Sequence, residues 1–206
     1  MKKYVLLILV IAGLGLLLSG CVNLTQSVLR VAFVNDYSGS MSSSAISHME
    51  TAVKTFIGYM QANDRGEYLA FGGNIINESG GFVAPSVLVG DVKGTGINGN
   101  ATKLYDAIYQ GLSHLSAQPA GYVKALIVMT DGYDNASSHT ANDVINYAKS
   151  LKIPIFTIGL GSVNTSVLQN MANQTGGKYY HAANSSDLLA IYRSLIKAVT
   201  GRIYLY

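Results

Sequence analysis

The feature that most constrains the fold is a regular alternation of short apolar runs with longer amphipathic segments. Residues 125–129 are apolar at every position, which is typical of a strand buried on both faces. After this run, Val144, Ile145, Ala148 and Leu151 recur at helical spacing. Further strands are predicted at residues 29–34, 67–71, 86–92, 154–158 and 177–181, and further helices at about 42–61, 104–115, 167–171 and 188–199.

This alternation predicts one α/β domain with a doubly wound, mostly parallel sheet and helices on both faces. Residues 203–206 could add an edge strand or fray. If the sheet is doubly wound, the first strand and the strand at 125–129 lie side by side where the strand order reverses.

The N-terminal segment has the pattern of a secretory leader. Lys2 and Lys3 precede an apolar run at residues 4–18, which is shorter than the ~20 residues of a membrane-spanning helix. The chain's only cysteine, Cys21, follows directly, and the sequence at 18–21, Leu-Ser-Gly-Cys, resembles the lipobox of bacterial lipoproteins. A plain signal peptide or an uncleaved anchor helix, with Cys21 as a bystander, is the alternative.

The lipobox resemblance implies that residues 1–20 are removed as a signal peptide and that the Cys21 thiol is diacylated. Residues 21–28 would then form a lipidated tether to a domain at 29–206. Two or three acyl chains give stable anchoring, which one chain does not. The expected location is the cell membrane or the outer membrane, with the domain outside the cytoplasm. Val22 is not the Asp that resembles an inner-membrane retention signal, which favours the outer membrane in a Gram-negative source.

Composition excludes several classes of function. Of 206 residues, 49% are hydrophobic and 12% are charged, which is too apolar for a disordered chain. Removing Lys2 and Lys3 from the formal net charge of +3 leaves +1, and the remaining basic residues are scattered along the sequence. That is not the footprint of a nucleic-acid-binding protein. Without Cys21 the domain has no thiol, so an oxidising compartment imposes no disulfide on it.

Oxygen-bearing side chains follow two of the predicted strands. Asp36, Ser38 and Ser40 come directly after the first strand, and Asp131 follows the strand at 125–129. Ligands of α/β sheets bind at the carboxyl ends of strands, so Asp36 and Asp131 are expected to flank one crevice. A carboxylate and two hydroxyls at alternate positions suggest a site for a hard cation. The same residue types also occur in ordinary turns and helix caps.

Together with Thr102, which precedes a predicted helix, these residues resemble the von Willebrand factor A-type (vWA) domain and its metal-ion-dependent adhesion site (MIDAS). That site combines Asp-x-Ser-x-Ser with a distant Thr and a distant Asp, and the resemblance covers about residues 29–206. It implies a site for Mg²⁺, or for Mn²⁺ or Ca²⁺. By resemblance, Ser38 and Ser40 coordinate directly, Thr102 does so in the ligand-competent state, and Asp36 and Asp131 act largely through water.

The resemblance further implies that an Asp or Glu of a protein partner completes the metal's coordination shell. One feature departs from the family pattern, and one residue competes with Thr102 for the role of threonine ligand. Asn100-Ala101-Thr102 replaces the family's usual Gly-Gly-Thr, and Thr95, between two glycines, is a rival for the threonine ligand. Tyr37, beside the site, is a candidate ligand contact, with packing on the sheet as the alternative.

Motifs of enzymes and of cofactor-binding proteins are incomplete in this sequence or lie at the wrong place in the predicted fold. Gly94-x-Gly96-x-x-Gly99 spells a dinucleotide fingerprint, but it does not follow the first strand, and no acidic residue lies about 20 positions beyond. A haloacid-dehalogenase-like phosphatase would need a second Asp where Ser38 stands. The four histidines show no zinc spacing. The prediction is therefore a binding module that is not an enzyme, with a structural subunit of an envelope complex as the alternative.

Overall fold

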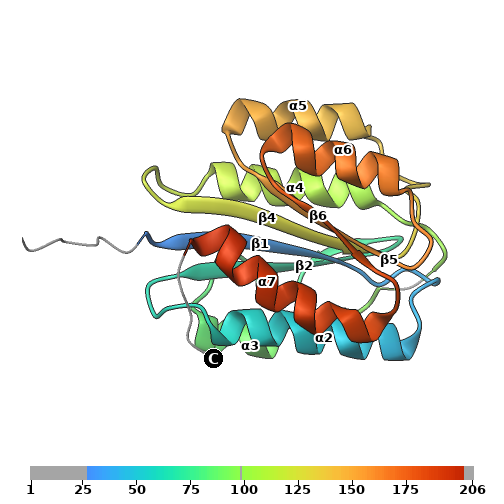
Figure 1. The fold of residues 1–206 in the computed structure, drawn as a ribbon, viewed down its shortest axis with the longest axis horizontal. Coiled ribbons are helices and arrows are strands. Elements are labelled where there is room, and N and C mark those ends of the chain that lie inside the picture. The colour runs from blue at the N-terminus through green and yellow to red at the C-terminus, as the bar shows by residue number, and fades with distance from the viewer. Residues whose placement is uncertain (1–26, 98, 202–206) are drawn as a thin grey trace, which may run out of the picture.

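The computed structural model describes residues 27–97 and 99–201, which form a six-stranded sheet in the order β3-β2-β1-β4-β5-β6 (Figure 1). All neighbouring strands are parallel except β3, which runs antiparallel to β2. The strands are β1 (Leu29–Asp36), β2 (Arg65–Phe71), β3 (Ile75–Asn77), β4 (Val123–Thr130), β5 (Ile155–Leu160) and β6 (Tyr179–Ala182).

The strand order reverses between β1 and β4, as the sequence predicts. β1 pairs with β2 on one side and β4 on the other, and the pairs Asn35↔Met129 and Asp36↔Phe71 align the three carboxyl ends. Residues that follow β1, β2 and β4 therefore emerge at one edge of the sheet. This is the switch point at which α/β folds bind ligands.

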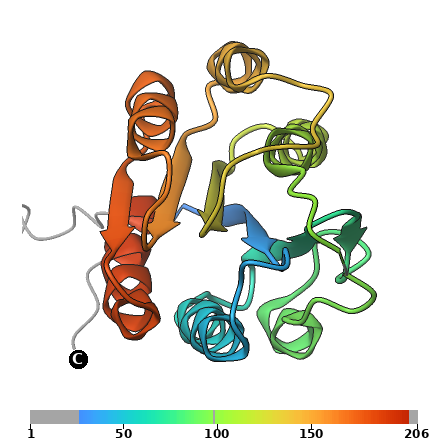
Figure 2. The ribbon, with the colours of Figure 1, turned by 90° about the vertical axis from the view of Figure 1, so that its right-hand side faces the viewer.

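Helices cover both faces of the sheet (Figure 2). The helices α2 (Ser43–Gly58), α3 (Pro85–Asp91) and α7 (Leu188–Thr200), with a short 3₁₀ turn at Ser185–Asp187, lie on one face; α4 (Leu104–Ser116), α5 (Ala141–Leu151) and α6 (Thr165–Thr175) lie on the other. Side-chain caps fix the starts of two of these helices. The Ser42 hydroxyl accepts from the Ala45 N–H in α2, and Thr140 and Asp143 form a reciprocal capping box in α5.

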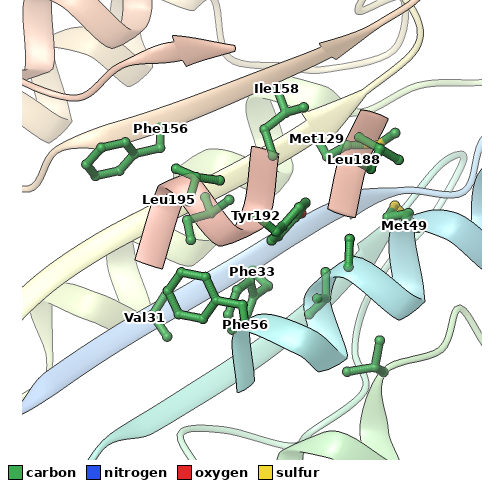
Figure 3. Close-up of a cluster of buried hydrophobic side chains, with 14 of the residues drawn as sticks. Val31, Phe33, Met49, Phe56, Met129, Phe156, Ile158, Leu188, Tyr192 and Leu195 are labelled. Carbon is green, nitrogen blue, oxygen red and sulfur yellow. The ribbon is translucent and has the colours of Figure 1, made fainter. Parts of the chain in front are cut away.

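The central strands β1, β2 and β4 bury alternate side chains in two separate cores. In the core between the sheet and α2 and α7, Phe33 meets Phe56 edge to face with ring centroids 5.2 Å apart (Figure 3). Tyr192 is fully buried in the same core, and its hydroxyl donates to Asn35 Oδ1 at 3.3 Å. These contacts fix the end of β1 against α7.

The predicted strand at residues 86–92 is wrong, because the segment forms helix α3. Pro85 stands in the first helical turn, where its fixed φ and missing N–H are tolerated. Leu88 and Val92, four residues apart, are buried, whereas Val87 is 54% exposed. The strand beside β2 is instead β3, which lies in a segment where no strand is predicted from the sequence. α2 ends at Gly58, three residues before the predicted end at 61.

Several predictions concern residues outside the described part of the chain. These are the signal peptide at 1–20, the acyl acceptor Cys21, most of the tether at 21–28 and the edge strand at 203–206. Within residues 27–97 and 99–201, no helix has the length and apolar character needed to cross a membrane.

Candidate metal-binding site

Asp36 ends β1 and is completely buried at the switch point. Both of its carboxylate oxygens are held: Oδ1 accepts from the Ser38 N–H at 2.7 Å, and Oδ2 accepts from the Thr130 hydroxyl at 2.6 Å. Burial raises the pKa of Asp36; the hydrogen bonds from Thr130 and Ser38 partly oppose this rise, and the charge of Asp131 adds to it. These hydrogen bonds therefore hold the Asp36 carboxylate in place behind the turn that carries Ser38 and Ser40.

Ser38, Ser40 and Asp131 form a continuous row of oxygens above Asp36. The Oγ atoms of Ser38 and Ser40 lie 3.1 Å apart, and the Ser40 hydroxyl donates to Asp131 Oδ1 at 2.6 Å. The turn is closed by a bond from the Met41 N–H to the Ser38 carbonyl at 3.0 Å. Residues 91 positions apart in the chain therefore meet, as the predicted sheet order requires.

The loop before α4 reaches over the turn that carries these serines. A Cβ atom on Gly39 would lie 2.5 Å from the side-chain oxygen of Asn100, so glycine permits this approach. Gly72, after β2, is equally close to the loop, since its Cβ would lie 2.8 Å from Ile97 and 3.4 Å from the Ser38 backbone. The loops after β1 and β2 and the loop before α4 are thus packed together.

Thr102 lies two residues before the start of α4 and is only 4% exposed. Its N–H donates to Asn135 Oδ1 at 2.8 Å, and its carbonyl accepts from the Asn135 N–H at 3.1 Å. The next residue, Lys103, donates its N–H to the Gly72 carbonyl at 3.0 Å. The backbone of Thr102 is therefore held between the loops after β2 and β4 although Asn100-Ala101 replaces the glycine pair of the family.

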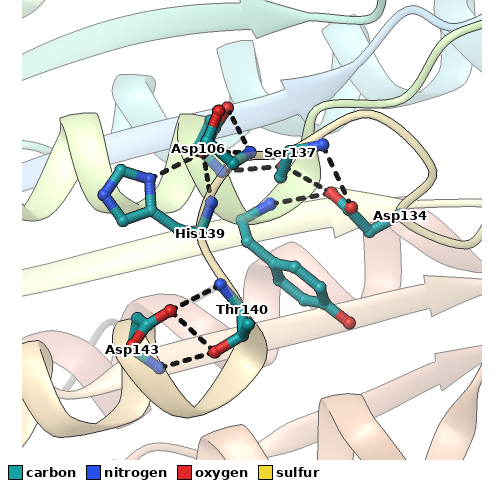
Figure 4. A network of polar contacts seen from close by, with 8 residues as sticks. Asp106, Asp134, Ser137, His139, Thr140 and Asp143 are labelled. Carbon is teal, nitrogen blue, oxygen red and sulfur yellow. Dashed lines mark hydrogen bonds and ion pairs between the residues drawn. The ribbon is translucent and has the colours of Figure 1, made fainter.

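The segment from Asp134 to His139 clasps the start of α4 (Figure 4). Asp134 Oδ2 accepts from the Tyr105 N–H at 3.2 Å, and the Ser137 hydroxyl accepts from the Asp106 N–H at 3.0 Å. In return, Asp106 accepts from the N–H groups of Ser138 and His139 at 2.9–3.0 Å, and its Oδ1 lies 2.6 Å from His139 Nδ1. This clasp ties the segment that carries Thr102 to the segment that carries Asp131.

The other two predicted contacts lie away from this row of oxygens. Thr95 is exposed, and its N–H is bonded to the carboxylate of Glu78. The Tyr37 hydroxyl donates to Glu50 Oε1 at 3.0 Å and lies 2.7 Å from the Tyr68 hydroxyl, and Gly94 packs against its ring. Burial raises the pKa of the Tyr37 phenol well above its usual range. The Thr95 backbone is thus engaged by Glu78, and the Tyr37 hydroxyl is engaged by Glu50 and Tyr68.

An open groove of about 410 Å³ lies beside the oxygens. It is lined by Ser40, Ser42, Asp131, Gly161, Ser162 and Ser185, among others. The Tyr133 side chain, two residues after Asp131, is 59% exposed, which is unusual for a large aromatic residue. A group from a partner protein could therefore approach Ser40 and Asp131 without rearrangement of the loops.

The donor set suits a hard divalent cation. Adjacent oxygens around octahedral Mg²⁺ at 2.0–2.1 Å are about 2.9 Å apart, close to the separation of the two serine hydroxyls. No cluster of three His, Cys, Asp or Glu side chains occurs within the described residues. The four histidines have separate neighbours, which are Ser185 for His48, Glu67 for His114, Asp106 for His139 and Tyr179 for His181.

Sequence reasoning missed the residues that support the site. Thr130, which holds Asp36, directly precedes Asp131 in the matched motif but received no role. Asp134 and Asn135 follow shortly after, and nothing local signals that Asp134 accepts from the first turn of α4 and Asn135 from the Thr102 N–H just before it. A weak signal exists at the start of α4, where Lys103 offers no side-chain cap and the helix needs acceptors from elsewhere.

A family model described as the von Willebrand factor type A domain matches residues 31–194. The chain belongs to this family. An uncharacterized protein of Borreliella burgdorferi is 30% identical over 105 residues, which is 40% of this chain and 30% of that protein.

Solved vWA structures share the fold at low identity. The von Willebrand factor type A protein from Catenulispora acidiphila has a TM-score of 0.72 at 18% identity, over 86% of this chain and 44% of that one. Proximal thread matrix protein 1 of the mussel byssus has a TM-score of 0.71 at 18% identity, over 84% and 46%. A further structure of the mussel protein has a MIDAS motif occupied by zinc.

The chain spans less than half the length of these three relatives. Their similarity, together with the family match, establishes the vWA fold predicted from the sequence, with a mixed α/β domain and a mostly parallel sheet between helices. Domains of this family are commonly protein-interaction modules and typically are not enzymes.

Proposed function

We propose that this vWA domain is a divalent-cation-dependent protein-binding module of a membrane-anchored lipoprotein. The observation that carries the proposal is the row of oxygens formed by Ser38, Ser40 and Asp131, beside an open groove. When Mg²⁺ or Mn²⁺ is bound, it supplies an electrophilic centre with a position for a carboxylate of the partner, an Asp or Glu. Cys21 carries the lipid anchor.

The residues divide into two groups by their hydrogen bonds. Ser38 and Ser40 present neutral hydroxyls and would hold the cation directly, and Thr102 joins them in the ligand-competent state. Asp36 has both oxygens engaged by Ser38 and Thr130, which supports a role through water. Asp131 already accepts from Ser40, which supports the same role. Few anionic donors contact the cation, so it keeps its attraction for an outside carboxylate.

Isothermal titration of MnCl₂ or MgCl₂ into the full chain tests the site. We expect measurable heat from the unsubstituted chain, and at least a tenfold loss of affinity in Ser38→Ala and in Asp131→Asn. Ser44→Ala is the matched control. Ser44 is exposed at the start of α2, and its hydroxyl bonds to the hydroxyl of Ser42. Undiminished heat in both site variants contradicts the proposal.

The partner chemistry is tested with defined probes. Acetate, and a short peptide with one Glu, should bind the metal-loaded chain and lose binding when EDTA is added or when the Glu is replaced by Gln. Melting curves separate this function from a purely structural site, since a bound metal stabilises the folded state by mass action. Loss of thermal stability with EDTA, without any metal-dependent binding of the carboxylate probes, would assign the site a structural role.

A further inference from the structure

Basic residues that are scattered in the sequence gather at one end of the domain. The parallel strands all begin at the same edge of the sheet, and each begins near a basic residue. Arg30, Arg65 and Lys124 lie in the first two positions of β1, β2 and β4, Lys152 lies three residues before β5, and Lys178 directly precedes β6. We call this end, together with the residues added below, the basic end.

The helices that return to this edge bring further cations. Lys149 stands in the last turn of α5 and Lys197 in the last turn of α7, with Arg193 one turn earlier. Arg193 and Lys197 also line a groove of about 770 Å³ that extends to Tyr59 at the end of α2. The basic end thus comprises Arg30, Arg65, Lys124, Lys149, Lys152, Lys178, Arg193 and Lys197. Five of these side chains are exposed, two are half-buried (Arg65 and Lys124), and Arg30 is buried; the exposed ones are Lys149, Lys152, Lys178, Arg193 and Lys197.

Carboxylates balance only part of these charges locally. Two acidic residues lie at the start of β2: Asp64 directly precedes the strand, and Glu67 is its third residue. Both are fully buried, and Asp64 accepts from the N–H groups of Leu29 and Gln61. Arg30 and Arg65 donate to backbone carbonyls, which leave the positive charge in place. Acidic residues instead accompany the carboxyl ends of strands and the starts of helices: Asp36, Asp131, Asp134, Asp106, Asp143 and Asp187.

The basic and acidic side chains are therefore equal in number but unevenly distributed over the domain. Lys2, Lys3 and Arg202 lie outside the described residues, so removing them from the 14 basic side chains leaves 11, which equals the 11 acidic side chains. Basic residues in the last turn of a helix favour its dipole, which accounts for Lys149 and Lys197. It does not account for Arg30, Arg65 and Lys124, which lie in strands.

The lipid anchor of the proposed function attaches at this same end. β1 starts at the basic end with Leu29, and Cys21 precedes Leu29 by eight residues, a reach of at most about 29 Å. A bilayer that holds Cys21 therefore lies close to the amino ends of the strands. Resting on that anchor, we propose that the basic end is a docking surface for an anionic phospholipid bilayer, which points the candidate metal site away from the membrane.

The strength of such docking follows from surface electrostatics. Each Lys or Arg close to an anionic bilayer strengthens association about fivefold, and the attraction fades within a Debye length of about 10 Å. Neutralising two exposed cations, as in Lys178→Gln with Lys197→Gln, should lower the ratio of docked to undocked domain about 25-fold. Lys93→Gln is the matched control, because Lys93 is exposed and adjoins Gly94, which packs on Tyr37 at the opposite end.

Fluorescence quenching in vesicles measures the orientation of the full chain. A maleimide dye is placed at Ser150→Cys, near the end of α5, or at Ser44→Cys, near the start of α2, both exposed and at opposite ends of the domain. The chain is reconstituted into vesicles of phosphatidylcholine, alone or with an equal part of phosphatidylglycerol, that contain a nitroxide-labelled lipid. With phosphatidylglycerol, the excess quenching of the dye at 150 over the dye at 44 should be larger than with phosphatidylcholine alone, and high salt or the double substitution should reduce it to the phosphatidylcholine level.

Equal quenching of the two dyes with phosphatidylglycerol, or a difference that phosphatidylcholine alone also gives, overturns the docking surface. The failure of the anchor has a separate readout. If Cys21 is not acylated, the chain without an introduced cysteine takes up the dye and does not float with vesicles of phosphatidylcholine. Titration with MnCl₂ shows whether the double substitution affects the candidate metal site, since it should leave the heat of MnCl₂ binding unchanged.

Discussion

At the scale of single residues, the sequence suggests candidate ligands but not the residues that support them. The spacing of Asp36, Ser38 and Ser40 is local, so it is visible in the sequence. The hydrogen bond from Thr130 to Asp36 joins residues 94 positions apart, and a threonine that precedes an aspartate has no local mark of this role. The structure adds that Asp36 is fully buried and depends on its donors.

Thr130→Val should destabilise the metal-free domain by about 1–3 kcal/mol, because a buried carboxylate oxygen loses its donor and nothing else replaces it. The free energy of unfolding is measured by urea titration in EDTA. Thr51→Val is the control, since the hydroxyl of Thr51 is exposed and bonds only to its own helix. A loss in Thr130→Val no larger than that in Thr51→Val would mean that Asp36 does not need this donor.

At the scale of elements, long periodic segments were predictable and short or proline-led ones were not. The helices after residues 104 and 188 and the strand at 125–129 follow clear patterns, and they form α4, α7 and β4. The valine-rich segment at 86–92 reads as a strand, yet Pro85 starts a helix there. β3 has only three residues, too few to show a period. The clasp on α4 depends on tertiary contacts and has no sequence pattern.

The clasp predicts a pH-dependent contribution to stability. Burial raises the pKa of Asp106, but the N–H groups of Ser138 and His139 and the His139 ring outweigh it and hold the pKa below its ordinary value of 3.8. A lowered carboxylate pKa gives stability that is present above the unfolded pKa and lost as pH falls through the folded pKa. Asp106→Asn should therefore cost about 1–2 kcal/mol at neutral pH, and less below about pH 4.

Urea titrations of the unsubstituted chain and Asp106→Asn at several pH values measure this difference. Asp91→Asn serves as the control, because Asp91 ends α3 and is outside the clasp. A difference between the two chains that stays constant from neutral pH to below pH 4 would contradict the clasp. If the clasp positions Thr102, Asp106→Asn should also weaken binding of Mn²⁺, whereas Asp91→Asn should not.

At the scale of the whole molecule, the adjacency of β1 and β4 could be predicted because strands and helices alternate, and it places Asp36 and Asp131 at one edge. The charge polarity could not, since it appears only when the beginnings of five strands are brought together. One arrangement thus places the candidate metal ligands at the carboxyl ends of the strands and gathers 8 of the 11 described basic residues at the amino ends.

The most direct test of the account is anomalous diffraction from crystals of the chain soaked in MnCl₂. The account predicts one strong peak within coordination distance of the Ser38 and Ser40 hydroxyls, and no such peak in crystals of Ser38→Ala soaked in the same way. A map without a peak there at saturating Mn²⁺, or a peak held by other residues alone, would contradict the central claim that these three loops form a cation site.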